Sequence, residues 1–289
     1  MRYLEPVFRP PSEAGSYILQ VTYGCSHNRC TFCSMYREKT FRVRDENEVF
    51  EDIREAARVM SGCERVFLAD GDALILRTDR LLRILDQLEQ HFPRLARVAI
   101  YSDARGINLK SDEELLSLRE RKLGMIYLGL ESGSDEVLRR IQKGATASEM
   151  TEAVRRAEAL GIPVSVIGLL GVGGRELTEE HARQTAQVLS RMSPSFFSAL
   201  TLTLVPDTPL AKDAEAGRFR MLTPEESLEE LARIIVDVQT ERPVVFRTNH
   251  ASNYVPLKGT LPENRERILE AIAWALKNRA LKPEWMRGL

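Results

Sequence analysis

The sequence predicts an α/β protein built around a parallel sheet, and three observations support this prediction. Short runs rich in β-branched and aromatic residues alternate six times with amphipathic helical segments. Glycine or small polar residues follow the apolar runs, and there is no low-complexity segment or obvious linker. Such an alternation builds either a doubly wound sheet or a full or partial barrel. The barrel is favoured, because polar residues that follow many successive strands then converge at one end.

Each expected strand is a short apolar run, and four of the six end in residues suited to a ligand site. The first leads directly into a loop with three cysteines, and the second ends near Gly71 and Asp72. Ser102 follows the third strand, while Glu131 and Ser132 follow the fourth. In chain order the strands are expected at 17–22, 65–70, 97–101, 125–130, 164–169 and 197–204.

The helices between these strands carry apolar residues at helical spacing. Two helix starts have the sequence of a capping box, Ser111 with Glu114 and Thr223 with Glu226, and in the second of them Pro224 takes the first helical position. Helices are expected at 46–60, after a cap at Thr78, from Ser111, from about Asp135, at 147–160, from Thr178, at 224–240 and at about 263–278.

Composition excludes several classes of protein. The 289 residues include 41 Lys and Arg against 42 Asp and Glu, so the net charge of −1 gives no reason to expect nucleic-acid or membrane partners. No apolar run reaches the length of a membrane span, and the first residues do not form a signal peptide. Four cysteines, three of them clustered, are not a secreted disulfide framework. We expect a cytoplasmic enzyme.

The clustered cysteines are the main indication of function. Four residues separate Cys25 from Cys30 and two separate Cys30 from Cys33, whereas Cys63 lies far away in sequence and has no predicted role. Three thiolates on a four-iron cluster leave one iron open to a substrate or cofactor. A zinc site that also uses His27 is an alternative, as are buried structural cysteines or a disulfide. The density of the cluster favours iron–sulfur.

Together with the strand ends, this loop resembles the radical S-adenosylmethionine enzymes. Their usual motif has three residues and then two between the cysteines, with an aromatic before the last; here the first gap is four, and Phe32 keeps the aromatic position. Gly71 and Asp72 stand where the family has a glycine–acid motif. The segment 129–138 is similar to the branch that includes oxygen-independent coproporphyrinogen dehydrogenases and methylthiotransferases, and the resemblance covers roughly residues 15–215.

The resemblance implies a partial (β/α)6 TIM-like barrel over residues 1–215. Residues 216–289 would then form a C-terminal extension of strand, loop and helix that packs on the barrel and closes it. It also implies that Cys25, Cys30 and Cys33 ligate a [4Fe-4S] cluster whose open iron is chelated by S-adenosylmethionine. Residues expected to contact the cofactors are Phe32, Gly71, Asp72, Ser102, Glu131, Ser132, Lys143 and Gly168.

The chemistry implied by the resemblance is reductive cleavage of S-adenosylmethionine. An electron, delivered by a donor such as flavodoxin or ferredoxin, would give methionine and a 5′-deoxyadenosyl radical that abstracts hydrogen from a substrate. Such an enzyme would be oxygen-sensitive. The sequence has no second cysteine cluster, and we expect no appended cobalamin or RNA domain and therefore a small or medium-sized substrate. The alternative is a non-catalytic iron–sulfur or haem-handling protein on the same fold.

Beyond residue 215 the segment 244–261 is polar and aromatic and predicts a strand that runs into a long loop. We expect Arg247, His250 and Tyr254 to lie on the substrate side and to act on the substrate; a closing flap with satisfied polar groups is the alternative. His181 stands in a helical pattern and is expected at the surface, as is His91.

Overall fold

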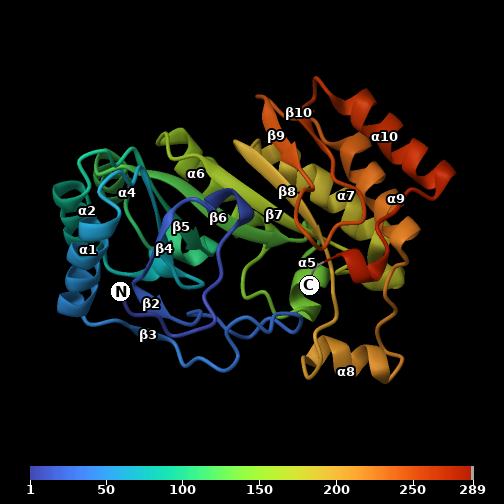
Figure 1. Ribbon diagram of the computed structural model, residues 1–289. Coiled ribbons are helices and arrows are strands. Elements are labelled where there is room, and N and C mark those ends of the chain that lie inside the picture. The colour runs from blue at the N-terminus through green and yellow to red at the C-terminus, as the bar shows by residue number, and fades with distance from the viewer. Residues whose placement is uncertain (288–289) are drawn as a thin grey trace. The chain divides into compact units, whose positions relative to one another are not determined.

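The computed structural model describes residues 1–287 (Figure 1). Contacts divide the chain into two compact units. The first comprises Met1–Asn28, Ser34–Leu128 and Arg156–Val164. The second comprises Arg29–Cys33, Gly129–Arg155 and the described residues from Ser165 onward. The predicted boundary at residue 215 falls within the second unit and stays a prediction.

The first unit is built on parallel strands, β1 (Tyr17–Gln20), β4 (Arg65–Ala69), β5 (Arg97–Ser102) and most of β6 (Leu123–Glu131). Two-residue strands β2 (Thr22–Tyr23) and β3 (Arg42–Val43) form a small antiparallel pair. The helical elements are η1 (Pro11–Glu13), α1 (Glu46–Val59), η2 (Ala73–Ile75), α2 (Thr78–His91), α3 (Ala104–Asn108) and α4 (Asp112–Glu120). In Figure 1, α1, α2 and α4 lie on one side of these strands.

The apolar side chains of these strands form the core of the first unit. Phe67, Leu68 and Ile100 are fully buried. The ring of Phe67 meets Tyr101 edge-on with 4.9 Å between centroids. Strands this apolar are typical of parallel sheets that are covered by helices.

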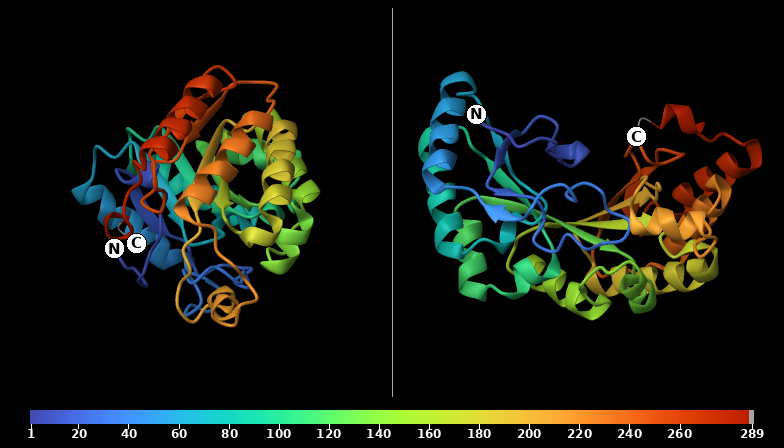
Figure 2. Two further views of the ribbon diagram at one scale, coloured as in Figure 1. Left: turned by 90° about the vertical axis from the view of Figure 1, so that its right-hand side faces the viewer. Right: turned by 90° about the horizontal axis from the view of Figure 1, so that it is seen from below.

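The second unit continues β6 and adds parallel strands β7 (Val164–Leu170), β8 (Phe196–Thr201) and β9 (Val244–Arg247), followed by antiparallel β10 (Lys258–Leu261). Its helical elements are α5 (Asp135–Arg140), α6 (Ala147–Ala159), α7 (Gly174–Met192), α8 (Pro209–Glu215), α9 (Pro224–Asp237), α10 (Arg265–Asn278) and η3 (Glu284–Met286). Helices α7, α9 and α10 lie side by side along the outer side of β8 and β9 (Figures 1 and 2). Phe197 and Phe246 stack within this unit at 5.7 Å.

The strand order of the main sheet is β1-β4-β5-β6-β7-β8-β9-β10. Helical connections separate the parallel strands, as right-handed crossovers require. The predicted α/β class with a mostly parallel sheet is therefore confirmed. Among residues 1–287, no helix is long and apolar enough to cross a membrane.

Most predicted elements are present, and both capping boxes are confirmed. Two predicted helix starts are wrong. Thr78 is the first residue of α2 rather than its cap, since Arg77 takes the cap position. Helix α7 begins at Gly174, before Thr178, because the Thr178 hydroxyl binds a distant carboxylate, that of Glu230, instead of capping. The segment predicted as a strand and a long loop forms the β9–β10 pair and the loop between them.

Candidate cofactor site

The cysteine segment, residues 24–39, begins directly after β2. Cys25, Cys30 and Cys33 are partly exposed thiols, as is Cys63, and none of the four is in a disulfide. Gly24, with φ of 74°, turns the chain ahead of Cys25. Within the second unit, the Thr31 N–H donates to the carbonyl of residue 141, and its carbonyl accepts from residue 210.

The donor set fits an iron–sulfur cluster, because three thiols fall within nine consecutive residues of an irregular, partly exposed loop. Over residues 1–287, no three His, Cys, Asp or Glu side chains are arranged as a ready metal site. The cluster assignment therefore depends on the cysteine spacing and on the family, and the predicted ligands stay a prediction.

In the first unit, Asp72 is the centre of a polar group at the end of β4. Its side chain is fully buried, and its Oδ1 accepts the backbone N–H of Asp103 at 3.2 Å. Its Oδ2 accepts the hydroxyl of Ser26, the residue after Cys25. Arg105 donates to the same hydroxyl at 2.6 Å. Asp72 thus joins the cysteine segment to the start of α3.

Burial raises the pKa of Asp72 to about 6, and the nearby negative charge of Asp103 adds to the effect. Both groups that donate to its carboxylate are neutral, a hydroxyl and a backbone N–H. Neutral donors compensate a buried carboxylate only partly, so a cationic group placed beside Asp72 would stabilise the ionised form.

Gly106 and Gly71 lie where an added side chain would collide with neighbouring residues. A Cβ on Gly106 would lie 2.6 Å from the Ser102 hydroxyl and 3.3 Å from Asp72 Oδ1. A Cβ on Gly71 would lie only 2.4 Å from the ring of Tyr36. Ser102 is buried and donates to the carbonyl of Asp103 at 2.7 Å, so its hydroxyl proton is used locally. The structure therefore gives Gly71 a packing role in addition to the predicted one.

In the second unit, Glu131 ends β6 and forms an ion pair with Lys143, with 2.9 Å between Oε1 and Nζ. Both side chains are 12% exposed. Glu131 has φ of 60°, a left-handed conformation that costs free energy for a residue with a side chain. A Cβ on Gly129 would lie 2.2 Å from the Glu131 carboxylate, so the glycine leaves room for it.

Ser132, the next residue, is held by a buried network that the sequence did not reveal. Its hydroxyl oxygen lies 2.8 Å from His181 Nδ1, and His181 Nε2 lies 3.6 Å from Glu230. Glu230 in turn accepts the N–H of Gly171 at 2.6 Å. The prediction that His181 is a surface residue is wrong, because the α7 face that carries it packs inward. Burial lowers the pKa of His181, which favours the neutral ring.

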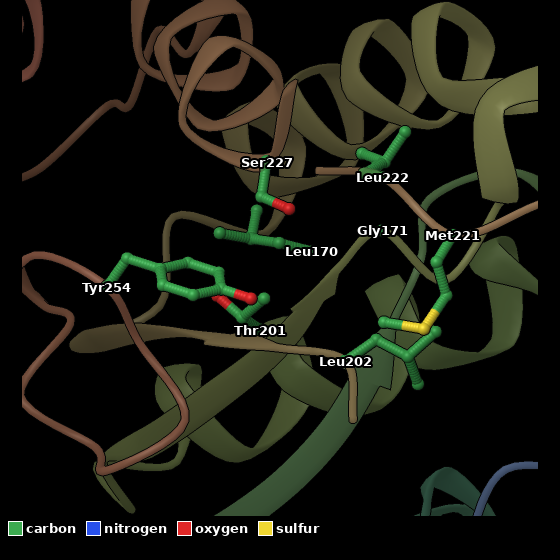
Figure 3. Close-up of a pocket in the computed structure, with 8 residues that line it drawn as sticks. All are labelled: Leu170, Gly171, Thr201, Leu202, Met221, Leu222, Ser227 and Tyr254. Atoms are coloured by element: carbon green, nitrogen blue, oxygen red, sulfur yellow. The ribbon is translucent and has the colours of Figure 1, made fainter. Parts of the chain in front are cut away.

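A small, narrow hollow with no room for a water molecule lies at the ends of β7 and β8 (Figure 3). Two of its hydroxyls are already paired within the unit: that of Thr201 donates to Asn253 at 2.9 Å, and that of Ser227 donates to the Thr223 carbonyl at 2.9 Å. The surface of the hollow is therefore mainly apolar. Its lining comprises Leu170, Gly171, Thr201, Leu202, Met221, Leu222, Ser227 and Tyr254.

Of the predicted substrate residues, only Tyr254 lines this hollow. His250 Nδ1 accepts the Ser252 N–H at 3.1 Å, and burial lowers the pKa of His250. The Arg247 guanidinium donates to the Phe246 carbonyl at 2.7 Å. Gly168 in β7 packs against a ring, and a Cβ there would lie 3.0 Å from Phe197.

Comparison with known proteins identifies the family. Residues 19–189, more than half of the chain, match the radical SAM superfamily. The chain belongs to the radical SAM superfamily. The matched region contains the cysteine segment, Asp72, Glu131 and the strands from the end of β1 to β7.

Curated relatives of this radical SAM protein are distant in sequence. A protein of Methanocaldococcus jannaschii that carries a provisional methylthiotransferase name is 25% identical over 150 residues, 49% of this chain and 32% of that protein. The 4′-phospho-dehydrooxetanocin synthase of Priestia megaterium is 25% identical over 53% of this chain and 23% of the synthase. The chain thus spans a third or less of the length of these relatives.

Solved structures share the fold. Coproporphyrinogen III oxidase of Escherichia coli, a radical SAM enzyme, superposes with a TM-score of 0.57 at 16% identity, over 76% of this chain and 51% of the oxidase. This match, together with the methylthiotransferase-like relative, is consistent with the branch that the sequence resembles.

Membership confirms the prediction that the protein is an enzyme and that its cofactors are those of the superfamily, a [4Fe-4S] cluster and S-adenosylmethionine.

Proposed function

We propose that Cys25, Cys30 and Cys33 ligate one [4Fe-4S] cluster and that the enzyme cleaves S-adenosylmethionine reductively. When bound, the cluster supplies the electron that converts S-adenosylmethionine into methionine and a 5′-deoxyadenosyl radical. The observation that supports this proposal best is Asp72, a buried carboxylate with neutral donors that is linked through Ser26 to the cysteine segment.

Asp72 is proposed to receive the amino group of S-adenosylmethionine. An ammonium group beside this carboxylate would form a charge-assisted hydrogen bond and lower the pKa of Asp72 from about 6. Ser102 and Gly106 shape the space beside it. Gly71, against which the Tyr36 ring packs, is proposed to contact the cofactor at the same strand end.

Glu131 and Lys143 are proposed to contact the cofactor. The pair holds the Glu131 carboxylate in one position, and a fixed group loses little conformational entropy when it binds a ligand. Ser132, Gly168 and Phe32 are proposed to line the cofactor without carrying charge.

The substrate is proposed to be a small or medium-sized organic molecule with an apolar group. Leu170, Leu202 and Leu222, which line the hollow at the ends of β7 and β8, would offer apolar surface to such a group. Arg247, His250 and Tyr254 are proposed to lie on the substrate side. Flavodoxin or ferredoxin is proposed as the electron donor.

The test is anaerobic reconstitution with iron and sulfide, followed by incubation with S-adenosylmethionine and a reductant. We expect a brown protein that releases 5′-deoxyadenosine and methionine in equal amounts. Cys25→Ala, Cys30→Ala and Cys33→Ala should each remove most bound iron, whereas the control Cys63→Ala should retain it.

Full iron retention in Cys30→Ala would contradict the ligand assignment. A wild-type protein that binds the cluster but yields no 5′-deoxyadenosine would contradict the proposed cleavage. Addition of tRNA or of small-molecule libraries to the same assay tests the substrate class, since the true substrate should increase the yield of methionine.

A further inference from the structure

A buried ion pair in the first unit joins the two ends of the cysteine segment. Lys39 Nζ lies 3.1 Å from Asp70 Oδ2, and the two side chains are 4% and 0% exposed. Asp70 directly follows β4, and Lys39 follows Cys33 in the chain. The cofactor contacts proposed above involve neither residue.

One carboxylate oxygen of Asp70 collects three donors. Its Oδ2 accepts the Gly24 backbone N–H at 3.2 Å, the Gln20 amide at 3.0 Å and the Lys39 ammonium at 3.1 Å. Gly24 immediately precedes Cys25. The entry to the cysteine segment and its exit are therefore held on the same atom.

The ammonium of Lys39 is fully paired. Besides Asp70, it donates to the backbone carbonyls of Leu4 at 2.7 Å and Pro6 at 2.5 Å. An ammonium has three protons, and these three acceptors use all of them. A buried charge with this set of partners is well compensated, and loss of one partner would leave the other charge unpaired.

A second set of contacts holds the same segment. The Gly71 N–H donates to the Gly24 carbonyl at 3.2 Å. Tyr36 packs over Gly71 so closely that a Cβ there would lie 2.4 Å from its ring, and Phe8 meets the same ring edge-on at 5.6 Å. The Asn28 side chain donates to the Tyr36 carbonyl at 2.8 Å and the Lys39 carbonyl at 3.3 Å.

We propose that Lys39 and Asp70 form a cysteine-loop clasp that holds the entry and the exit of the cysteine segment together and slows the loss of the cluster. The inference rests on the proposed function, since it assumes that the three cysteines hold the cluster. Closing a flexible segment around a metal centre costs conformational entropy. Because the clasp already closes the segment in the folded apo protein, part of this entropy is lost before iron binds. The cluster should therefore dissociate more slowly.

The clasp is a set of positioning residues, and its removal should show in the cluster itself. The variants are Lys39→Met and Asp70→Asn, in the full chain. The control is Glu13→Gln, which removes the charge of the buried Glu13 from another ion pair of the first unit, with the partly exposed Arg97. The measurements are iron per chain after reconstitution, the rate of iron transfer to a ferrous chelator, and the melting temperature of the apo protein.

We expect Lys39→Met and Asp70→Asn to release iron about tenfold faster than wild type, as is common when groups behind a metal ligand are removed. Glu13→Gln should release iron at the wild-type rate, even if its melting temperature falls as much as that of the clasp variants. The electron paramagnetic resonance spectrum of the reduced cluster should also broaden in the clasp variants, because the ligand geometry is less uniform.

The double variant Lys39→Met/Asp70→Leu separates positioning from stability. Replacing a buried pair with apolar residues often restores stability. Because Leu leaves the Gly24 N–H and the Gln20 amide without this acceptor, we expect the melting temperature to recover only in part while iron release stays fast; recovery of slow release would overturn the inference. If Lys39→Met does not fold, the isosteric Asp70→Asn provides the same comparison.

The outcomes also separate this inference from the proposed function. Release at the wild-type rate from iron-loaded Lys39→Met and Asp70→Asn would overturn the clasp alone. A wild-type protein that never binds iron would overturn the proposed function, and the clasp with it.

Discussion

The surroundings of Asp72 determine its pKa and therefore its charge. As a sequence position it is an acid after an apolar run, which many surface loops also provide. In the structure it is buried, bonded to neutral donors, and has a pKa raised to about 6 by burial and by Asp103. Its ionised form is therefore destabilised, and a bound cation beside the carboxylate would stabilise it.

Replacing Asp72 with Asn should stabilise the apo protein near neutral pH. The pKa of Asp72 is 3.8 ordinarily and about 6 in the folded protein, so between these values the folded state binds more protons than the unfolded state. The free energy of unfolding of the wild type therefore falls as pH rises through this range, by about 3 kcal/mol at most.

The measurement is urea unfolding of wild type and Asp72→Asn at several pH values. The advantage of the variant should be full above about pH 7 and should vanish below about pH 4. An advantage that is independent of pH would show that Asp72 is not the titrating group. The same variant should weaken binding of S-adenosylmethionine to the reconstituted protein.

Glu131 offers a second test at this scale. Glu131→Gln removes the charge that pairs with Lys143 and keeps the shape of the side chain. We expect normal iron content and about tenfold weaker binding of S-adenosylmethionine, the usual cost of losing one charged hydrogen bond. Calorimetry on the reconstituted protein measures this.

The matched control for Glu131 is Glu136→Gln on α5, whose carboxylate pairs with Arg139 and Arg140 on the helix surface. Glu136→Gln should bind S-adenosylmethionine with wild-type affinity. Equal affinity for Glu131→Gln and Glu136→Gln would make Glu131 a structural residue only.

At the scale of elements, Arg287, which directly follows η3, binds the loop after β9. Arg287 is 3% exposed, and its guanidinium stacks on the Tyr254 ring at 4.3 Å and donates to the Tyr254 hydroxyl at 2.7 Å. It also reaches the Ser252 carbonyl at 2.9 Å and the Thr203 hydroxyl at 3.1 Å. These bonds hold Tyr254 over the hollow at the ends of β7 and β8.

We expect Arg287→Ala to destabilise the protein by about 2–4 kcal/mol, because several buried acceptors lose their donor at once. Backbone amides of residues 250–254 should exchange hydrogen faster than in the wild type. The control is Arg233→Ala on the exposed face of α9, which should change neither quantity. Unchanged exchange in Arg287→Ala would show that the loop is held by its other contacts.

At the scale of the whole molecule, each unit has its own apolar core, around Phe67 and Ile100 in the first and around Phe197 and Phe246 in the second. Removing iron should therefore leave the protein folded. The melting temperature should fall by an amount that depends on free iron concentration, since the cluster binds only the folded state. Circular dichroism before and after anaerobic chelation measures this, and a loss of most helical signal would contradict it.

The sequence by itself determined the α/β class, the order of the elements and the superfamily. These follow from local patterns, because apolar periodicity, capping boxes and closely spaced cysteines are all properties of neighbouring residues. The strands and helices consequently agree with the structure to within a few residues in most cases.

Only the tertiary structure decided which polar residues are buried and what they contact. His181, expected at the surface, is buried beside Ser132, and Lys39 is paired with Asp70. Lys39 and Asp70 are far apart in the chain. The partner of a buried charge is set by packing between such distant segments. Periodicity along one segment carries no information about that packing, because it shows which face turns inward but not what that face meets.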